Sequence, residues 1–219
     1  MKKLIVYMTA CLLMSINAHA AMINNGNFQT CDLSGWQKDT DGLGDVGASA
    51  DFSVVDNAGA CSAQIYVDDL DTSTAFFANT LFTDLDLSAT DGQTLTLSFD
   101  WLFEGTDGDA LFGDYFSVFL GDGSGDSFDA SGNLGFLVDS TSEYGSGMFS
   151  IELDASLYNQ TGWTLEFQLF DALSPTSDIL FSSLQIDNVQ LIANAVNTPA
   201  SSLMFMFALA FVCLRNTRN

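Results

Sequence analysis

Apolar and polar residues alternate through most of the middle of the chain. The odd-numbered positions of 95–103 hold Leu, Leu, Phe, Trp and Phe, and those of 163–169 hold Trp, Leu, Phe and Leu. A period of two is typical of strands that bury one face, and clusters of Gly, Asp, Ser and Asn separate the runs. The pattern predicts about nine strands, at 50–56, 62–68, 75–82, 93–103, 115–120, 134–138, 148–153, 163–170 and 184–192.

No stretch of the sequence shows convincing helical periodicity, and strong helix formers are scarce. About nine strands in one domain predict an all-β fold, an antiparallel two-sheet β-sandwich with jelly-roll topology. The last run changes phase, because Leu184 and Ile186 share one parity whereas the apolar residues after them share the other. This slip predicts a β-bulge at Asp187 and Asn188, and such a bulge can turn Asp187 toward a ligand.

The N-terminal end differs from this middle part. The first 20 residues combine two lysines, an apolar stretch and Ala-His-Ala, which is typical of a secretory signal peptide cleaved after Ala20. A lipoprotein signal that uses Cys11 is the weaker alternative, because apolar sequence continues beyond that cysteine. We therefore expect export, a signal peptide at 1–20 and a β-sandwich domain at 21–193.

The C-terminal segment, 194–219, is expected to be a linker followed by a short hydrophobic helix. Its apolar run at 203–214 is shorter than the roughly 20 residues of a membrane-spanning helix, and a basic end at 215–219 follows it. A sorting signal and a plain membrane anchor would both have this composition. The shortness of the run favours the sorting signal.

The body of the chain is strongly acidic. All 28 acidic residues lie between positions 21 and 199, where Lys38 is the only basic residue, so this part has a formal charge of −27. Such a charge argues against nucleic acid and anionic lipid as partners. It also makes folding costly unless cations, from calcium or a salty medium, screen the carboxylates.

Cys31 and Cys61 are the only cysteines of the body. In an exported protein an even pair predicts a disulfide. The bond would close a loop of about 30 residues and stabilise the fold by roughly 3 kcal/mol. A reactive cysteine is the weaker alternative, because no histidine remains in the body to activate it.

Catalytic groups are scarce in the body. The only histidine, His19, lies in the expected signal peptide, so the exported chain has none for a Ser-His-Asp or Cys-His arrangement. Zinc sites of the usual kind lack ligands for the same reason. A carboxylate pair for glycoside hydrolysis stays open among the 28 acids, although no hydrolase motif accompanies them. We therefore expect a protein that is not an enzyme.

Three segments resemble known families. NNGNFQTCDLSGW, at 24–36, resembles the opening motif of the galactose-binding-like jelly rolls of many carbohydrate-binding modules, and QIDNVQL, at 185–191, resembles their closing strand. The segment 98–120 resembles the central strands of exported proteins with PEP-CTERM tails. The resemblance implies a jelly-roll fold and specifies function only as far as a class that includes carbohydrate binders.

The tail resembles a PEP-CTERM sorting signal of Gram-negative bacteria. VNTPASSL stands at 196–203 where that family has V-P-E-P-S-x-L, so the first proline and the glutamate are missing and the tail is a variant form. The resemblance implies transient insertion in the inner membrane, processing by an exosortase-like membrane protease, and delivery to the cell surface or the extracellular space. The sorting residues would be Thr198, Pro199, Ala200, Ser201, Arg215 and Arg218.

Calcium is the candidate cofactor, because loops dense in Asp offer oxygen ligands. The acidic clusters are Asp39, Asp41 and Asp45; Asp68, Asp69 and Asp71; Asp107 and Asp109; and Asp122, Asp126 and Asp129. The resemblance implies instead a structural calcium between the N-terminal motif and the closing strand, with Gln29 and Asp187 as ligands. Gln29 stands where the family has Glu, which would weaken that site. The alternative is that these aspartates are solvated turn residues.

A sugar site needs aromatic rings that are exposed beside polar groups. Trp36, Trp101 and Trp163 share the apolar parity of their strands, which predicts core packing. Tyr115 has the opposite parity to its apolar neighbours and can stand on an open face. The freer tyrosines are Tyr66, Tyr115, Tyr144 and Tyr158.

Taken together, these features predict an exported, non-catalytic component of the cell surface or extracellular matrix. A lectin-like carbohydrate-binding module, with extracellular polysaccharide as its partner, is the first alternative. A polysaccharide hydrolase is the second. An exposed aromatic pair on one sheet face would favour the lectin-like module, and two carboxyl groups in a deep cleft would favour the hydrolase.

Overall fold

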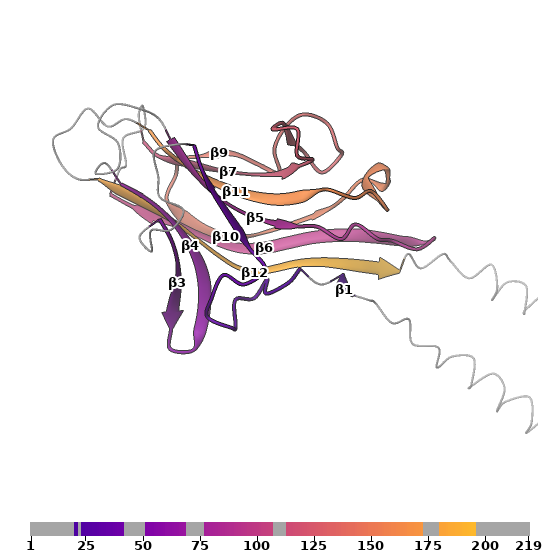
Figure 1. Ribbon diagram of the computed structural model, residues 1–219, viewed down its shortest axis with the longest axis horizontal. Coiled ribbons are helices and arrows are strands. Elements are labelled where there is room, and N and C mark those ends of the chain that lie inside the picture. The colour runs from indigo at the N-terminus through magenta and orange to yellow at the C-terminus, as the bar shows by residue number, and fades with distance from the viewer. Residues whose placement is uncertain are drawn as a thin grey trace, which may run out of the picture.

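Two stacked β-sheets form the protein. The computed structural model describes residues 20–21, 23–41, 51–68, 77–106, 113–172 and 180–195. In this part of the chain the fold is all-β, and two six-stranded antiparallel sheets lie face to face as a sandwich (Figure 1). The expected signal peptide, apart from its last residue, and the expected sorting tail lie outside the described residues.

The first sheet is built around two long strands. Its order is β10 (Gly145–Glu152), β6 (Gln93–Gly105), β12 (Phe181–Ala195), β4 (Ala60–Asp68) and β3 (Phe52–Asn57), and β1 (Ala20–Ala21) also pairs with β12. β12 lies between β6 and β4, at the centre of the sheet. Because Asn194 and Ala195 still pair with β6, β12 extends two residues beyond position 193.

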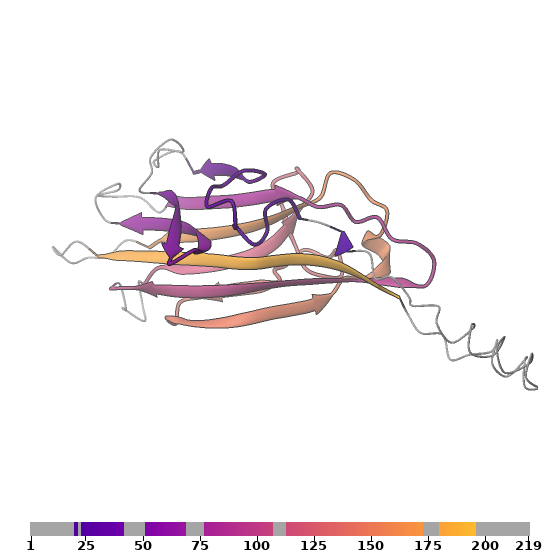
Figure 2. The ribbon, with the colours of Figure 1, turned by 90° about the horizontal axis from the view of Figure 1, so that it is seen from below.

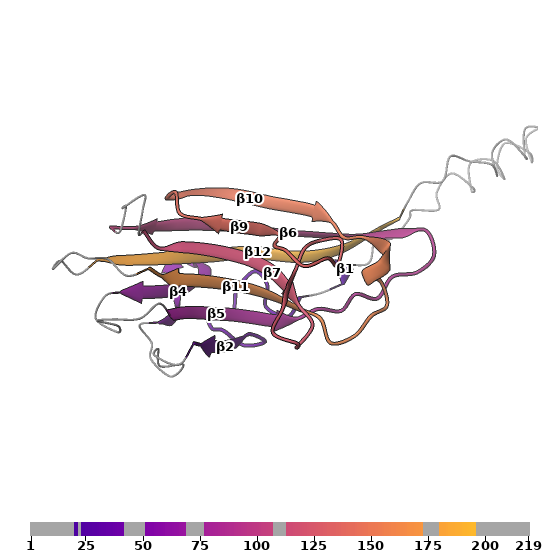
Figure 3. The same cartoon turned by 90° about the horizontal axis from the view of Figure 1, so that it is seen from above.

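The second sheet covers the first. Its order is β2 (Gln37–Thr40), β5 (Phe77–Asp84), β11 (Thr164–Asp171), β7 (Tyr115–Gly121) and β8 (Ser127–Phe128), and β9 (Val138–Thr141) also pairs with β7. Figure 3 shows this sheet from above, with β11 between β5 and β7. A 3-10 turn at Ala155–Leu157 follows β10. Among the described residues no helix is long and apolar enough to cross a membrane.

The core lies between the sheets and follows the alternation in the sequence. On β6, Leu95, Leu97, Phe99 and Phe103 point inward, and at most 1% of each residue is exposed. Apolar residues of β11 meet them from the other sheet, where the rings of Phe99 and Phe167 lie edge to face with centroids 4.9 Å apart. Burial of such side chains, worth about 1.5–3 kcal/mol each, holds the two sheets together.

The three tryptophans belong to this core, as their parity predicts. Trp36 and Trp163 are buried. Trp101 is half-buried, and its ring packs against Phe116 of the second sheet with centroids 5.3 Å apart. Trp36 and Trp163 therefore present no free ring face to solvent as a sugar platform would require, whereas Trp101 is partly exposed.

Eight of the nine expected strands are present, with their ends shifted by a few residues. The expected strand at 134–138 is wrong, because Leu134 makes only an isolated bridge to Phe128 and is 72% exposed, and the strand in this region is β9. The sequence pattern does not predict β1, β2 or β8, since two to four residues are too few to show alternation.

β12 contains the expected bulge. Its register against β6 shifts between Asp187 and Gln190, and Asn188 between them has a left-handed backbone with a φ of 52°. Before the bulge β12 pairs with β4, and after it β12 meets β1 and the N-terminal turn, where the Val189 N–H donates to the Gly26 carbonyl at 2.8 Å. The strand changes neighbours at the bulge, which explains the slip in parity.

A disulfide joins the N-terminal segment to β4. Cys31 and Cys61 are bonded, with Cα atoms 5.4 Å apart, as the even pair of cysteines predicts. Cys61 is buried near the start of β4, whereas Cys31 lies in the turns before β2. The bond therefore holds the N-terminal turns against the first sheet. Such bonds are typical of proteins in oxidising compartments.

Candidate functional site

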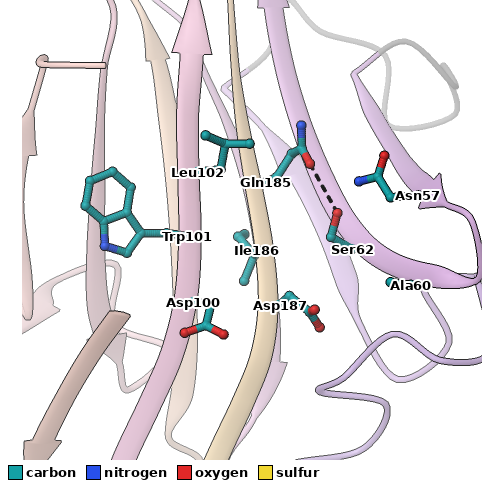
Figure 4. A pocket seen from close by; sticks show the side chains of 9 residues that line it. All are labelled: Asn57, Ala60, Ser62, Asp100, Trp101, Leu102, Gln185, Ile186 and Asp187. Carbon is teal, nitrogen blue, oxygen red and sulfur yellow. Dashed lines mark hydrogen bonds between the residues drawn. The ribbon is translucent and has the colours of Figure 1, made fainter. Parts of the chain in front are cut away.

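An open pocket lies on the outer face of the first sheet, the side of the molecule seen in Figure 2. It has a volume of about 200 Å³ and lies where the β3–β4 hairpin meets β12 and β6 (Figure 4). Its lining residues are Asn57, Ala60, Ser62, Asp100, Trp101, Leu102, Gln185, Ile186 and Asp187. Most of the outward side chains in this set are polar, and they lie within a lining that is largely apolar, so the pocket offers hydrogen-bonding groups beside apolar surface.

The strand register explains which side chains meet in the pocket. Leu102 of β6 lies opposite Gln185 of β12, and two residues further along Asp100 lies opposite Asp187. The period of two turns all four side chains to the same face of the sheet, with the two rows separated by about 7 Å. Figure 4 shows the carboxylates of Asp100 and Asp187 together at one end of the pocket.

Hydrogen bonds connect the polar side chains of the pocket. The Ser62 hydroxyl donates to Gln185 Oε1 at 3.3 Å, and Gln185 Nε2 donates to Glu104 Oε1 at 3.3 Å. Asn188 Nδ2 donates to Asp100 Oδ2 at 2.8 Å. These contacts orient the amide and the carboxylate, and each carboxylate retains lone pairs that can accept from a further donor.

Asp100 and Asp187 concentrate negative charge in the pocket. Burial raises the pKa of Asp187, and the charge of Asp100 adds to this rise, while the hydrogen bond from the Asn188 N–H acts in the opposite direction. Like charges that lie opposite each other on neighbouring strands destabilise a sheet. Lys38, the only base of the body, lies on β2 of the other sheet. The pocket therefore favours hydrogen-bond donors and cations and disfavours anions.

A stacked aromatic pair continues the same outer face. Tyr66 of β4 and Phe181 of β12 are half-buried, with ring centroids 5.6 Å apart and an interplanar angle of 19°. Tyr66 lies opposite Ser183, which shares the outward parity of Gln185 and Asp187 on β12. The six residue steps of extended strand from Phe181 to Asp187 span about 20 Å. The aromatic pair and the pocket thus form one line, which we call the outer strip.

A second stacked pair lies on the outer face of the second sheet. Tyr115 of β7 and Phe170 of β11 lie opposite each other, with ring centroids 4.6 Å apart and an interplanar angle of 17°. Both residues are half-buried, and burial raises the pKa of Tyr115. The outward position of Tyr115 confirms the prediction made from its parity.

The other two tyrosines serve the fold. The Tyr158 hydroxyl accepts from the Leu95 N–H at 3.0 Å and donates to the Leu153 carbonyl at 2.9 Å. The Tyr144 hydroxyl lies 2.9 Å from Ser182 Oγ, on the inner side of the first sheet. Their hydroxyl groups hold strands and loops together, so the two outward pairs are the better candidates for a sugar platform.

Several aspartates that the sequence offers as calcium ligands bind their own loops. Asp129 Oδ1 accepts from the N–H groups of Ser131 and Asn133, and Asp122 Oδ1 accepts from the Ser124 N–H. In the part of the chain that the structure describes, no group of three or more His, Cys, Asp or Glu side chains converges as a metal site. Positions 45, 69, 71, 107 and 109 lie outside that part.

The calcium site implied by the resemblance stays a prediction. Gln29 is exposed in the N-terminal turn, where its main-chain N–H bonds to Asn27 Oδ1 at 3.4 Å. Asp187 lines the pocket and faces Asp100. Both residues can offer oxygen to a hard cation.

Sequence reasoning found only part of the outer strip. Asp187 and Tyr66 are sequence candidates. Asp100 and Gln185 have no local signal that separates them from other polar residues of strands. They become site residues because β6 and β12 pair in a register that places them beside Asp187.

Comparison with known proteins finds no matching family model and no matching curated protein. Among solved structures, a cyclase from Fischerella sp. TAU is 16% identical, and the match covers 83% of this chain and 100% of that one with a TM-score of 0.46. The carbohydrate-binding module TmCBM27, described for specific mannan recognition, is 13% identical over 82% of this chain and 100% of its own, with a TM-score of 0.45. A family 16 carbohydrate-binding module is 16% identical over 77% of this chain and 97% of its own, with a TM-score of 0.43. The chain is thus similar to these proteins in its β-sandwich fold alone.

Proposed function

We propose that this protein is an exported, non-catalytic carbohydrate-binding module whose outer strip binds a glycan chain. The observation that carries the proposal is the strip itself, in which a stacked aromatic pair and a polar pocket lie in line on one sheet face. Sugar rings have apolar faces and hydroxyl groups at their edges. They therefore need aromatic surface and hydrogen-bonding groups in the same site.

Each part of the outer strip has its own role. The rings of Tyr66 and Phe181 provide the surface on which one sugar ring stacks. Gln185 exchanges hydrogen bonds with hydroxyl groups further along the chain, and the carboxylates of Asp100 and Asp187 accept from hydroxyl donors in the pocket. Hydrogen bonds to charged acceptors are roughly twice as strong as neutral ones, so the acidic end of the strip orients the ligand.

The ligand is a neutral polysaccharide. The body carries a formal charge of −27, and two of its carboxylates lie together in the pocket. Uronic acids and sulfated sugars would bring like charge to this surface and be repelled. A neutral chain brings hydroxyl donors without that cost.

A glycan array probed with the purified protein tests the proposal, and calorimetric titration with the neutral glycans found there measures affinity. We expect Tyr66→Ala to weaken binding about tenfold, because an aromatic contact contributes roughly 0.5–1.5 kcal/mol beyond its buried area. Absence of binding to every neutral glycan on the array would contradict the function.

Tyr115→Ala is the matched control. Tyr115 is also one half of a half-buried, stacked Tyr–Phe pair, but it lies on the opposite face of the sandwich. The control should bind the glycan with the affinity of the unchanged protein. Loss of binding in Tyr115→Ala with full binding in Tyr66→Ala would assign the site to the second sheet and remove the outer strip.

The proposal also covers the cellular location and the finer fold class of the protein. We infer a galactose-binding-like jelly roll, exported from a Gram-negative bacterium and sorted to the cell surface by an exosortase-like system, with calcium as a stabilising ion. The variant PEP-CTERM-like tail at 196–219 supports the sorting, and the disulfide supports an oxidising location. A surface location brings the outer strip to extracellular polysaccharide.

A further inference from the structure

Three polar side chains are buried at one end of the second sheet. Asp171 ends β11, Asp114 directly precedes β7, and Asn79 belongs to β5, so the three come from neighbouring strands in the order β5, β11, β7. Asp171 is 2% exposed, Asp114 is 3% exposed and Asn79 is 0% exposed. Aspartates are almost never fully buried unless they are paired.

The strand register brings the two carboxylates together. β11 and β7 pair as far as Phe170 and Tyr115, and the next position in the same register is Asp171 opposite Asp114. The Ala172 N–H donates to Asp114 Oδ1 at 2.9 Å, which holds this carboxylate against the end of β11. Since Phe170 and Tyr115 point outward, the two aspartates point into the sandwich, with Cβ atoms about 5 Å apart.

Asn79 supplies an independent sign of a ligand. Its Nδ2 donates to the main-chain carbonyl of Tyr66 at 2.8 Å, whereas its Oδ1 is buried and accepts no hydrogen bond among the described residues. Asn79 pairs with Leu169, so on the inner face it is the diagonal neighbour of Asp171. A buried carbonyl oxygen without a donor is rare in native proteins and indicates a further partner such as an ion.

The sequence offers almost no base to neutralise these carboxylates. Lys38 is the only basic residue between positions 21 and 199, and its ammonium group lies over the ring of Phe52, 5.5 Å from the centroid. Hydrogen bonds orient buried carboxylates but leave their charge in place, whereas a bound cation removes it. Carboxylate and amide oxygens are the ligands that hard divalent cations prefer.

We propose that Asn79, Asp114 and Asp171 bind a calcium ion at this end of the sandwich. The site is distinct from the outer strip and from the pair Gln29 and Asp187. Because Asn79 also holds the backbone of Tyr66, the ion stabilises one end of the outer strip. This last consequence rests on the proposed function, whereas calcium binding itself does not.

Calorimetric titration of the EDTA-stripped, purified protein with calcium chloride tests the site, without any glycan, at about pH 7. We expect binding, and a Tm that rises by about 5–10 °C when free calcium is about 100 times Kd. The double variant Asp114→Asn and Asp171→Asn keeps the shape of both side chains and removes their charges. Its calcium-dependent rise in Tm should disappear, and in EDTA it should melt no lower than the unchanged protein.

Two further variants keep the outcome decisive. Glu152→Gln removes an exposed carboxylate from β10 of the other sheet and should keep the full calcium response. The single variant Asp171→Asn should bind calcium at least tenfold more weakly, which gives a readout if the double variant does not fold. The proposal is overturned if the unchanged protein binds no calcium, if Glu152→Gln loses the response, or if the variants of Asp114 and Asp171 keep it.

Discussion

Asp100 and Asp187 are two residues whose placement opposes folding. They lie opposite each other on β6 and β12 with their carboxylates in one pocket, and each would be more stable beside a neutral partner. The pKa of Asp187 is raised by burial, and carboxylates with perturbed pKa values are found at functional sites more often than elsewhere. At the residue scale, this pair therefore distinguishes the outer strip, as a candidate site, from the turns with their solvated aspartates.

The raised pKa of Asp187 has a defined consequence for stability. Its folded pKa lies above the unfolded value of about 3.8, so in this range the folded state binds protons more tightly than the unfolded state. The stabilising contribution is fully present below about pH 3.8 and is lost as the pH rises through the folded pKa. Asp187→Asn should therefore be more stable than the unchanged protein at about pH 7, and this gain should shrink on acidification, as urea unfolding at several pH values would measure.

Asp86→Asn is the control of opposite sign. Hydrogen bonds from Ser88, first from its hydroxyl and then from its N–H, lower the pKa of Asp86. Its stabilising contribution is present above the unfolded pKa and is lost as the pH falls through the folded pKa. The variant should therefore lose stability at about pH 7 and approach the unchanged protein in acid. A gain for Asp187→Asn that is equal at all pH values would contradict the assignment to charge.

At the scale of elements, β12 organises the molecule. It lies at the centre of the first sheet, and it exchanges β4 for β1 and the N-terminal turn at the bulge. The exchange depends on a close backbone approach, because the Val189 N–H donates to the Gly26 carbonyl at 2.8 Å. The bulge follows Asp187 directly, so β12 holds both the N-terminal turn that contacts it and the side chains of the pocket.

Gly26→Ala should destabilise the fold at this contact. A Cβ atom at position 26 would collide with the main-chain oxygen of Val189, which cannot move without moving β12. We expect a loss of about 1–3 kcal/mol in the free energy of unfolding, measured by urea denaturation. Gly145→Ala is the control, since a Cβ atom there meets no neighbour, and its effect should stay within about 0.5 kcal/mol. Equal effects of the two variants would show that the close approach is unimportant.

At the scale of the whole molecule, the acidic sandwich is distinct from its two ends. The basic residues other than Lys38 lie at positions 2, 3, 215 and 218, in the segments expected to be removed. Their removal would leave a chain that is more acidic than the whole and is kept soluble by its own charge.

Intact mass spectrometry of protein recovered from outside the cell tests whether the two terminal segments are removed from the acidic sandwich. We expect a chain that begins at about Ala21 and lacks the segment after about Pro199, because our proposal requires cleavage of both the signal peptide and the sorting tail. The membrane fraction of the same cells is the control, where precursor with the tail should be found. An extracellular chain that still contains Arg218 would contradict the sorting proposal.

Features that depend on residues close together in the sequence could be predicted, whereas features that depend on contacts between distant strands could not. The phase slip at Asp187 is local, so the sequence shows the bulge directly. The strand expected at 134–138 is wrong because Leu134 forms only an isolated bridge to Phe128, and the strand of this region begins at Val138, which pairs with Val118. Asn79, Asp114 and Asp171 have no special pattern in the sequence. Only the pairing of β5, β11 and β7 shows that they meet.

The sequence by itself determined the all-β sandwich and the Cys31–Cys61 bond. Alternation is carried by each strand separately, and the two cysteines of the body have only one possible pairing. Only the tertiary structure decided that Asp100 faces Asp187, that Tyr66 stacks on Phe181, and which face of the sandwich has the pocket. The reason is that register and strand order result from the simultaneous packing of all strands, and a one-residue shift in any pair would turn these side chains to the other face.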